Sequence, residues 1–396
     1  MESCVSVVIV NYNGGPLLTE CVRSVLASTV PVEVLVSDNA SSDNSLLLLR
    51  LALGGDARLH IVENARNLGF AKGNNRVLPL AKGDRFLFLN PDCLLQPDTI
   101  ARMSDLLASD SEIGMAGCLI RNPDGTEQPG CRRNIPTPSR VFFQMAGLKR
   151  FSKVKADENR YLLVNQPLPE KPQQVEAISG AFMLIPRNAL EDVGLLDEGY
   201  FMHFEDLDWC VRFNTAGWKV VFEPRVEILH VGGVCSASKP IGVEYFKHRS
   251  MVRFYRKFFQ RSQPFLLYFI VMPSIIGRFL VQVFKHGLAS VGLYRPRQPA
   301  RQAEQAAMNS AQTHPRLDSS DGKDRKVVVT GATSLIGNFM LPLLVHAGYE
   351  VHAISRHPPD YGSDAGITWH QADLETDTPA ILKSADILLH LGILLI

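Results

Sequence analysis

Residues 5–120 alternate short aliphatic runs with segments of helical periodicity. Four runs have the pattern of β-strands, namely VSVVIV (5–10), VEVLVS (32–37), LHIVE (59–63) and FLFLN (86–90). The first is almost continuously apolar, as expected of a strand buried on both faces of a sheet. Apolar residues recur at helical spacing between the runs, near residues 17–26, 45–53 and 70–80. Strands that alternate with helices predict an α/β fold with a parallel, doubly wound sheet.

Polar side chains follow two of these strands directly. Asp38 and Asn39 come after the second strand, and Asn90 and Asp92 flank a proline after the fourth. Ligands of open α/β sheets gather beyond the carboxyl ends of the strands, so these residues are candidates for a binding site. Asp92 is also a candidate metal ligand, because Mg²⁺ needs only one or two carboxylates when substrate phosphates complete its shell. Taken alone, Asp38 is better explained by turn or helix-cap chemistry.

A cluster of acids stands among aromatic residues in FMHFEDLDWC, residues 201–210, before a predicted helix that ends near residue 215. Solvated carboxylates need no aromatic walls, so Glu205, Asp206 and Asp208 predict a bound cation, a proton-transfer role or a helix end. The helix-end explanation is the favourable interaction of acids with the N-terminal pole of the helix dipole. It suits Asp208 best, whereas Asp206 is the stronger candidate for chemistry.

Two consecutive segments point to a membrane surface. Residues 244–261 carry six Lys or Arg and one Glu among aromatic side chains, and residues 265–284 carry Arg278 as their single charge. The second segment has the length of a bilayer span, but Pro273 interrupts it and basic residues lie on both of its sides. We therefore favour an interfacial or re-entrant helical pair that binds anionic headgroups over a full span. A packed helical hairpin with a solvated basic face is the remaining alternative.

Composition narrows the classes of protein that fit. The chain of 396 residues suffices for two domains, and its 46% hydrophobic and 20% charged residues are typical of a globular protein. A net charge of +1 gives no overall attraction to nucleic acid, so we expect no nucleic-acid partner. Seven cysteines without a C-x-x-C pair indicate reduced thiols and a cytosolic compartment. We expect no signal peptide and a cytoplasmic catalytic face, because no basic segment precedes the first apolar run.

A linker and a second βα unit follow the basic and apolar segments. Residues 295–325 are rich in Gln, Ala, Pro, Arg and Ser, and residues 326–396 open with KVVVTGATSLIG. This glycine turn resembles the start of extended short-chain dehydrogenase/epimerase domains, where it meets a pyrophosphate at a helix N-terminus. That resemblance implies a dinucleotide-binding role for Gly331, Gly337 and Asp373. Ser334 replaces the middle glycine and the family's Tyr-x-x-x-Lys pair is absent, so we expect at most a degenerate or truncated NAD(P)-binding half.

Five motifs in the first part of the chain resemble a known family. They are, in order, VSVVIVNYNGG, SDNASSD, ENARNLGFAKGNN, FLNPDC and FMHFEDLDWC. This order is that of family-2 inverting glycosyltransferases of the GT-A fold, and the likeness is strongest to bacterial rhamnosyltransferases that build cell-surface polysaccharide. The resemblance implies a Rossmann-like GT-A domain with a mainly parallel sheet. The expected divisions of the chain are 1–240 for this domain, 241–294 for a membrane-associated helical segment, 295–325 for the linker and 326–396 for a partial Rossmann-like unit.

The same resemblance implies roles for individual residues. Asp206 is the expected catalytic base, with Glu205 beside it to orient the acceptor or the helix. The family's Asp-x-Asp motif is Asn-Pro-Asp here, so a divalent metal, Mg²⁺ or Mn²⁺, would depend on Asp92. His230 would be a second ligand or, with equal weight, a structural histidine.

The nucleotide-sugar donor would contact residues of the other motifs. Tyr12 would lie against the nucleotide base, and Asp38 would hydrogen-bond that base. The remaining donor contacts implied by the resemblance are Asn67, Gly69, Asn74, Asn90 and Asp92.

These residues together predict a membrane-associated, metal-dependent inverting glycosyltransferase. It would move L-rhamnose from dTDP-rhamnose to a polyprenyl-diphosphate-linked saccharide at the cytoplasmic face of the bacterial inner membrane. One alternative is a nucleotide-sugar epimerase or dehydrogenase acting through the C-terminal unit, which the absent Tyr-x-x-x-Lys disfavours. Another is a catalytically silent membrane scaffold, which the co-occurrence of Asp38, Asp92 and Asp206 at one sheet edge disfavours.

Overall fold

The computed structural model of the protein describes most of the chain up to residue 290 and shorter pieces beyond it. The described residues are 4–138, 140, 161–164, 166–232, 240–260, 265–290, 326–330, 341, 344–345, 349–355, 367–372, 381 and 387–390. The chain divides into two compact units, Met1–Asn309 and Ser310–Ile396. Each unit has its own hydrophobic core.

The first four predicted strands form a parallel sheet, as their alternation with helices predicts. Their spatial order is β3-β2-β1-β4, with bounds Leu59–Glu63 for β3, Val32–Asp38 for β2, Val5–Asn11 for β1 and Arg85–Leu89 for β4. Every residue of β1 and β2 is buried, which accounts for their apolar sequences. The strand order reverses between β1 and β4, and a reversal of this kind opens a crevice where ligands bind.

Beyond β4 the sheet is mixed rather than mainly parallel, which corrects the expectation from the sequence. Strand β10 (Phe182–Pro186) runs antiparallel between β4 and β6 (Ile113–Arg121), and β11 (Lys219–His230) runs parallel to β6. The short strands β5 (Cys93–Leu94) and β8 (Gln173–Gln174) pair antiparallel with β11. Because β10 is buried over nearly its whole length, its apolar sequence matches that of a parallel strand and does not reveal its direction.

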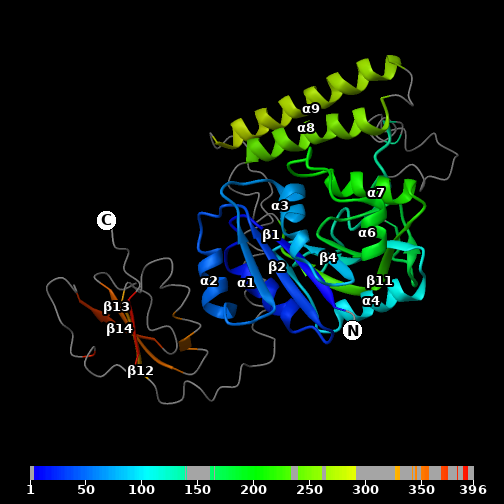
Figure 1. Ribbon diagram of the computed structural model, residues 1–396. Helices are drawn as coiled ribbons and strands as arrows, with labels where there is room; N and C mark the ends of the chain where they lie inside the picture. The colour runs from blue at the N-terminus through cyan, green and yellow to red at the C-terminus, as the bar shows by residue number, and fades with distance from the viewer. Residues whose placement is uncertain are drawn as a thin grey trace. The chain divides into compact units, whose positions relative to one another are not determined.

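Short helices connect these strands and cover the sheet (Figure 1). Their bounds are Gly15–Leu26 for α1, Ser45–Leu53 for α2, Phe70–Val77 for α3, Thr99–Ser109 for α4, Arg187–Val193 for α6 and Glu205–Thr215 for α7. Pro16 lies in the first turn of α1, where a proline fits, and three acids occupy the first turn of α7. The helices predicted near 17–26, 45–53 and 70–80 are confirmed.

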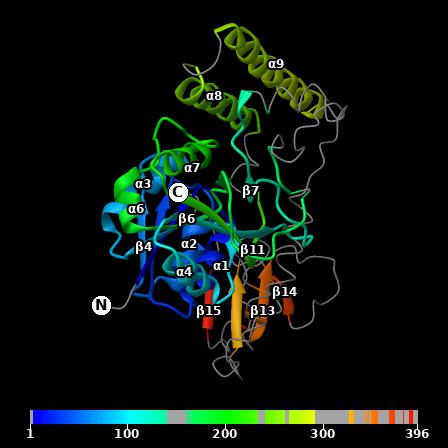
Figure 2. The same ribbon diagram turned by 90° about the vertical axis from the view of Figure 1, so that its right-hand side faces the viewer.

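Two long helices at one end of this unit come from the basic and apolar segments. Helix α8 spans Pro240–Phe258 and helix α9 spans Phe265–Ser290. Figures 1 and 2 both show them at the same end of the α/β domain, close to α7. Among the described residues, no helix is both long and apolar enough to cross a membrane.

The second unit contains a four-stranded parallel sheet of order β14-β13-β12-β15. The strands are β12 (Lys326–Thr330), β13 (Glu350–Ser355), β14 (Ile367–Gln371) and β15 (Ile387–His390). In chain order this is 3-2-1-4, which is the arrangement of the first four strands of a doubly wound nucleotide-binding fold. The predicted dinucleotide-binding residues Gly331, Gly337 and Asp373 lie outside the described residues.

Candidate active site

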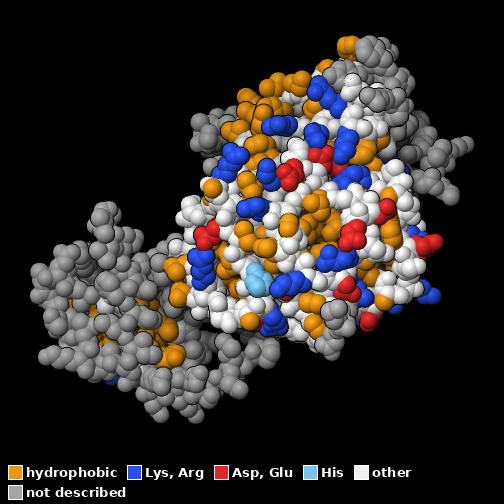
Figure 3. Space-filling model, viewed as in Figure 1, with side chains coloured by type: hydrophobic (Ala, Val, Ile, Leu, Met, Phe, Trp, Pro, Cys, Tyr) orange, Lys and Arg blue, Asp and Glu red, His pale blue; other side chains and the backbone are white. Residues whose placement is uncertain are grey.

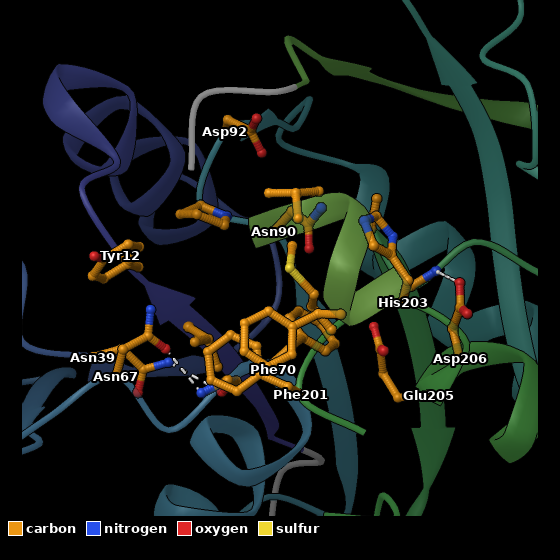
Figure 4. A pocket seen from close by; sticks show the side chains of 18 of the residues that line it. Tyr12, Asn39, Asn67, Phe70, Asn90, Asp92, Phe201, His203, Glu205 and Asp206 are labelled. Carbon is orange, nitrogen blue, oxygen red and sulfur yellow. Dashed lines mark hydrogen bonds between the residues drawn. The ribbon is translucent and has the colours of Figure 1, made fainter. Parts of the chain in front are cut away.

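A cavity of about 520 Å³ opens at the carboxyl ends of β1 and β4 (Figure 4). In Figure 4, Tyr12, Asn39 and Asn67 lie at one side of the cavity, and His203 and Asp206 lie at the other. Eight of the residues predicted for the site line the cavity, namely Tyr12, Asn67, Gly69, Asn90, Asp92, Glu205, Asp206 and His230. The structure therefore brings together residues that stand far apart in the sequence.

The wall that carries Asn67 and Gly69 is held by backbone contacts that only glycine permits. Gly69 has φ +82°, and a Cβ there would overlap the Phe201 carbonyl oxygen. Its amide donates to Asn67 Oδ1 at 2.9 Å, and its carbonyl accepts from Asn39 Nδ2 at 3.0 Å. Phe70 N donates to the same Phe201 carbonyl at 2.7 Å. This turn thus joins the N-terminal motifs to the loop that precedes the acidic cluster.

Asp38 and Asn74 lie close to the cavity but are not part of its lining. Asp38 is buried, and its oxygens accept hydrogen bonds from Asn11 Nδ2 at 2.7 Å and from the Ser41 amide at 2.9 Å. Asn74 is buried within α3 and donates to the Phe70 carbonyl at 2.9 Å. At the end of β2 the cavity is instead lined by Asn39, which its place after this strand made a binding-site candidate but to which the family resemblance gave no role.

Asp92 and His230 meet because β11 pairs antiparallel with β5, which sets His230 opposite Cys93. His230 Nε2 lies 3.0 Å from Asp92 Oδ1, while Nδ1 lies 2.6 Å from Gln128 Oε1. Because Gln128 Oε1 accepts a hydrogen bond, it places the imidazole proton on Nδ1. Nε2 then offers a lone pair beside a carboxylate oxygen, and Asn90 Nδ2 lies 3.2 Å from the same nitrogen.

These acceptors fit a divalent cation. In the part of the chain that the structure describes, Asp92, Cys93 and His230 are the one group of three or more His, Cys, Asp or Glu side chains whose potential ligand atoms all lie within 4.8 Å of one another. Asp92 and His230 line the cavity, whereas the Cys93 thiol is buried against the Ala181 carbonyl. A carboxylate and an imidazole whose other nitrogen is hydrogen-bonded are a common pair of metal ligands.

Asp206 and Glu205 begin α7 after two residues with left-handed backbone, His203 at φ +62° and Phe204 at φ +71°. Asp206 Oδ2 accepts hydrogen bonds from the Gly180 amide at 3.1 Å and from the Arg133 guanidinium. Gly180 lies here because β10 pairs antiparallel with β4. The same pairing continues past the strands, where Asn90 N donates to the Ala181 carbonyl at 3.0 Å. The mixed part of the sheet therefore sets the acidic pair beside the Asn-Pro-Asp turn.

Glu205 occupies a different environment from its neighbour. Its side chain is buried, and Oε2 has no hydrogen-bond partner among the described residues. Burial and the adjacent Asp206 carboxylate raise the pKa of Glu205 well above its ordinary value. Glu205 thus retains a proton under conditions in which an exposed glutamate has lost it.

Helix α8 completes the cavity, a contribution that the sequence did not indicate. Gly242, Val243 and Phe246 belong to the lining. The ring of Phe246 stacks on Phe201 with centroids 4.1 Å apart, and Phe201 also lines the cavity. Aromatic residues interleaved with cations on one helix were the available signal, but they also fit a membrane-facing helix.

Several cations of α8 are paired with acids of the α/β domain. Arg253 donates to Asp197 at 2.7 Å, and Lys257 lies 2.7 Å from Asp197 and 2.6 Å from Asp208. Ser250 Oγ also donates to the Met202 carbonyl at 3.0 Å. Helix α8 therefore contacts the chain on both sides of the acidic pair. Arg253 and Lys257 form ion pairs within the protein.

Two parts of the chain match known protein families. Residues 6–194 match the model of glycosyl transferase family 2, and residues 327–394 match that of the NAD dependent epimerase/dehydratase family. The N-acetylglucosaminyl-diphospho-decaprenol L-rhamnosyltransferase of Mycobacterium tuberculosis is 31% identical over 58% of this chain and 76% of its own length. This chain belongs to glycosyl transferase family 2. The enzyme is therefore a glycosyltransferase of the hexosyltransferase type, as its motifs predict.

Two further proteins are similar to this glycosyltransferase. The rhamnosyltransferase WbbL of Escherichia coli strain K12 is 25% identical, over 57% of this chain and 83% of its own length. A solved structure of a mannosyltransferase from Pyrobaculum calidifontis, in complex with GDP-Man and Mn²⁺, is 16% identical with a TM-score of 0.47. It covers 88% of this chain and 85% of that one.

Proposed function

We propose that the glycosyltransferase transfers L-rhamnose from dTDP-rhamnose to a lipid-linked saccharide, with inversion at the anomeric carbon. The observation that carries the proposal is a single cavity lined both by Asp92 and His230, the candidate metal ligands, and by the acidic pair Glu205 and Asp206. The sugar and the acceptor follow the names of two relatives, both rhamnosyltransferases, one of which names a diphospho-decaprenol carrier.

Inverting transfer needs one displacement step. The acceptor oxygen forms a bond to the anomeric carbon while the bond to the diphosphate oxygen breaks, and the electron pair leaves with the nucleoside diphosphate. Asp206 takes the acceptor hydroxyl proton as general base. Tyr12, Asn67 and Gly69, at the other side of the cavity, bind the donor, and the aromatic residues that line the cavity limit hydrolysis by water.

A divalent metal, Mg²⁺ or Mn²⁺, is proposed to bind Asp92 and His230. When bound it supplies positive charge to the departing diphosphate. The residues of this chain orient that site, because Gln128 fixes the imidazole and the Gly232 amide donates to Asp92 Oδ2 at 3.1 Å.

We also propose that helix α9 rests on the anionic cytoplasmic surface of the bacterial inner membrane. Five apolar side chains of α9 are more than half exposed, namely Phe269, Ile276, Leu280, Val281 and Phe284. Figure 3 shows hydrophobic side chains gathered along the outer helix, with Lys and Arg beside them. Arg278 and Lys285 of α9 and Arg249 of α8 are exposed and complement anionic headgroups. A bilayer surface fits this combination of an apolar face and a cationic rim.

A donor and acceptor screen tests the transferase proposal. We expect the full chain with Mn²⁺ to transfer sugar from dTDP-rhamnose to a polyprenyl-diphosphate-linked N-acetylglucosamine, and not from UDP-glucose or GDP-mannose. Asp206→Asn should lower kcat at least about 100-fold and leave donor affinity within about 2-fold, because it removes the base and keeps the shape. Asp105→Asn, an exposed aspartate on α4, is the matched control. Equal loss of donor binding and turnover in Asp206→Asn would contradict the role as base.

A further inference from the structure

Arg133 is a largely buried cation in contact with Asp206. It lies on the short strand β7 (Arg132–Arg133), which pairs with β9 (Ala177–Ile178). Its guanidinium donates to Asp206 Oδ2, to the Ile178 carbonyl at 3.2 Å and to the Tyr161 hydroxyl at 3.3 Å. The side chains of Arg133 and Asp206 are only 13% and 14% exposed, so solvent screens their interaction weakly.

Neighbouring ion pairs hold the Arg133 segment in place. Arg132 is buried and binds Glu127 with Nε 2.9 Å from Oε1. Arg140 donates to Glu176 at 2.7 Å, and Glu176 also accepts the Ile135 amide at 2.7 Å. These contacts lie away from the cavity lining and fix the backbone on both sides of Arg133.

The two oxygens of Asp206 have unequal partners. Oδ2 accepts hydrogen bonds from Arg133 and from the Gly180 amide, whereas Oδ1 accepts from the Leu207 amide at 2.8 Å. Arg133 is the cation hydrogen-bonded to this carboxylate among the described residues. The other titratable side chains around Asp206 and its immediate neighbours are Tyr161, His203, Glu205, Asp208, Cys210, Glu244 and Lys247.

We propose that Arg133 is a positioning residue for the transfer reaction, which fixes Oδ2 of Asp206 and leaves Oδ1 to accept the proton of the acceptor hydroxyl. The inference rests on the proposed role of Asp206 as base. A guanidinium presents its N–H donors in a rigid plane, so it holds a carboxylate oxygen that accepts from it in a defined direction. Arg133 and the Gly180 amide both donate to Oδ2, so together they restrict rotation of the Asp206 carboxylate.

The separation of kcat from KM tests this role. In Arg133→Gln, we expect kcat to fall about 10- to 100-fold through loss of orientation, with the donor KM within about 2-fold. Arg133→Lys, which keeps a cation of different geometry, should lower kcat less.

Arg140→Gln is the matched control, because Arg140 anchors the same loop without contacting Asp206. It should leave kcat within about 2-fold, even if thermal stability falls. If Arg133→Gln does not fold, Tyr161→Phe removes one contact of Arg133 and should still lower kcat with the donor KM unchanged. An unchanged kcat in a folded Arg133→Gln or Tyr161→Phe enzyme would overturn the inference while Asp206→Asn remained inactive. An active Asp206→Asn enzyme would instead overturn the proposed function.

Discussion

Two adjacent carboxyl groups in the site, those of Glu205 and Asp206, have opposite surroundings. Asp206 is paired with a largely buried guanidinium, whereas an oxygen of Glu205 is buried without a partner among the described residues. The guanidinium holds the Asp206 carboxylate in place, and burial favours the protonated form of Glu205. Neighbouring acids in such different environments can serve different roles in one reaction. Residue type alone did not distinguish them.

The raised pKa of Glu205 has a consequence for stability. A folded-state pKa above the ordinary value of 4.5 means that the folded protein retains a proton that the unfolded chain releases. The contribution of Glu205 to the free energy of unfolding is fully present below about pH 4.5. It falls by at most about 1.4 kcal/mol per pH unit as the pH rises toward the raised pKa. Glu205→Gln should remove this decline.

Urea unfolding at pH 5 and pH 8 measures the effect. We expect the loss of unfolding free energy between these pH values to be smaller in Glu205→Gln than in the unmodified protein. Glu170→Gln, at an exposed glutamate, should leave the loss unchanged. Equal pH dependence in the Glu205 variant and the unmodified protein would show that Glu205 titrates normally.

Asp92 is expected to determine metal-dependent donor binding. Asp92→Ala removes the carboxylate that faces His230 Nε2, so donor affinity in the presence of Mn²⁺ should fall by at least about 10-fold. Affinity measured with a chelator present should change little. Calorimetric titration of dTDP with and without Mn²⁺ makes the comparison, and Asp98→Ala at an exposed aspartate serves as control. An unchanged Mn²⁺ effect would exclude Asp92 from the metal site.

At the scale of elements, α8 joins the proposed membrane face to the catalytic loop. Its inner side carries Phe246, Ser250 and Lys257, which contact the segment that contains Glu205 and Asp206. Deletion of residues 244–295 would be a poor test of anchoring, because it would also remove part of the cavity wall. The outer face of α9 allows a more selective test, because its side chains are exposed.

Replacement of Ile276, Leu280 and Phe284 together by Ser is expected to weaken binding to anionic vesicles about 10- to 100-fold. The reason is the loss of apolar surface that would enter the headgroup region. Co-sedimentation with phosphatidylglycerol vesicles provides the measurement. Replacement of Leu47 and Leu51 by Ser, two exposed leucines of α2, is the matched control and should bind as the unmodified protein does. Equal sedimentation of both variants would contradict the membrane assignment for α9.

At the scale of the whole molecule, the chain contains two units with separate cores. All residues that line the cavity belong to the first unit. A chain of residues 1–309 should therefore fold and transfer sugar with kcat within about 2-fold of the full chain. Thermal unfolding and transfer assays of the two chains measure this, and a large loss of turnover in a folded 1–309 chain would show that the second unit contributes to the reaction.

The sequence by itself determined the parallel half of the sheet and most of the site. Buried strands need continuous apolar runs and short helices need apolar residues at helical spacing, so local pattern was sufficient for β1 to β4 and for α1 and α2. The sequence also predicted correctly that motif residues at the ends of these strands belong to the site. Tyr12, Asn90 and Asp92 all line the cavity, because the carboxyl ends of parallel strands share one edge.

Only the tertiary structure decided the remaining contacts. The direction of β10 and the register of β11 against β5 bring Asp206 and His230 to the same cavity, and neither is encoded in a local pattern. At the end of β2, the side chain of Asn39 lines the cavity, whereas that of Asp38 accepts a hydrogen bond from Asn11. Arg133, which contacts Asp206, lies in a proline-rich region whose sequence has no helical or strand periodicity. Contacts between distant segments depend on strand pairing and packing, which act across the fold, whereas periodicity records only what each segment buries.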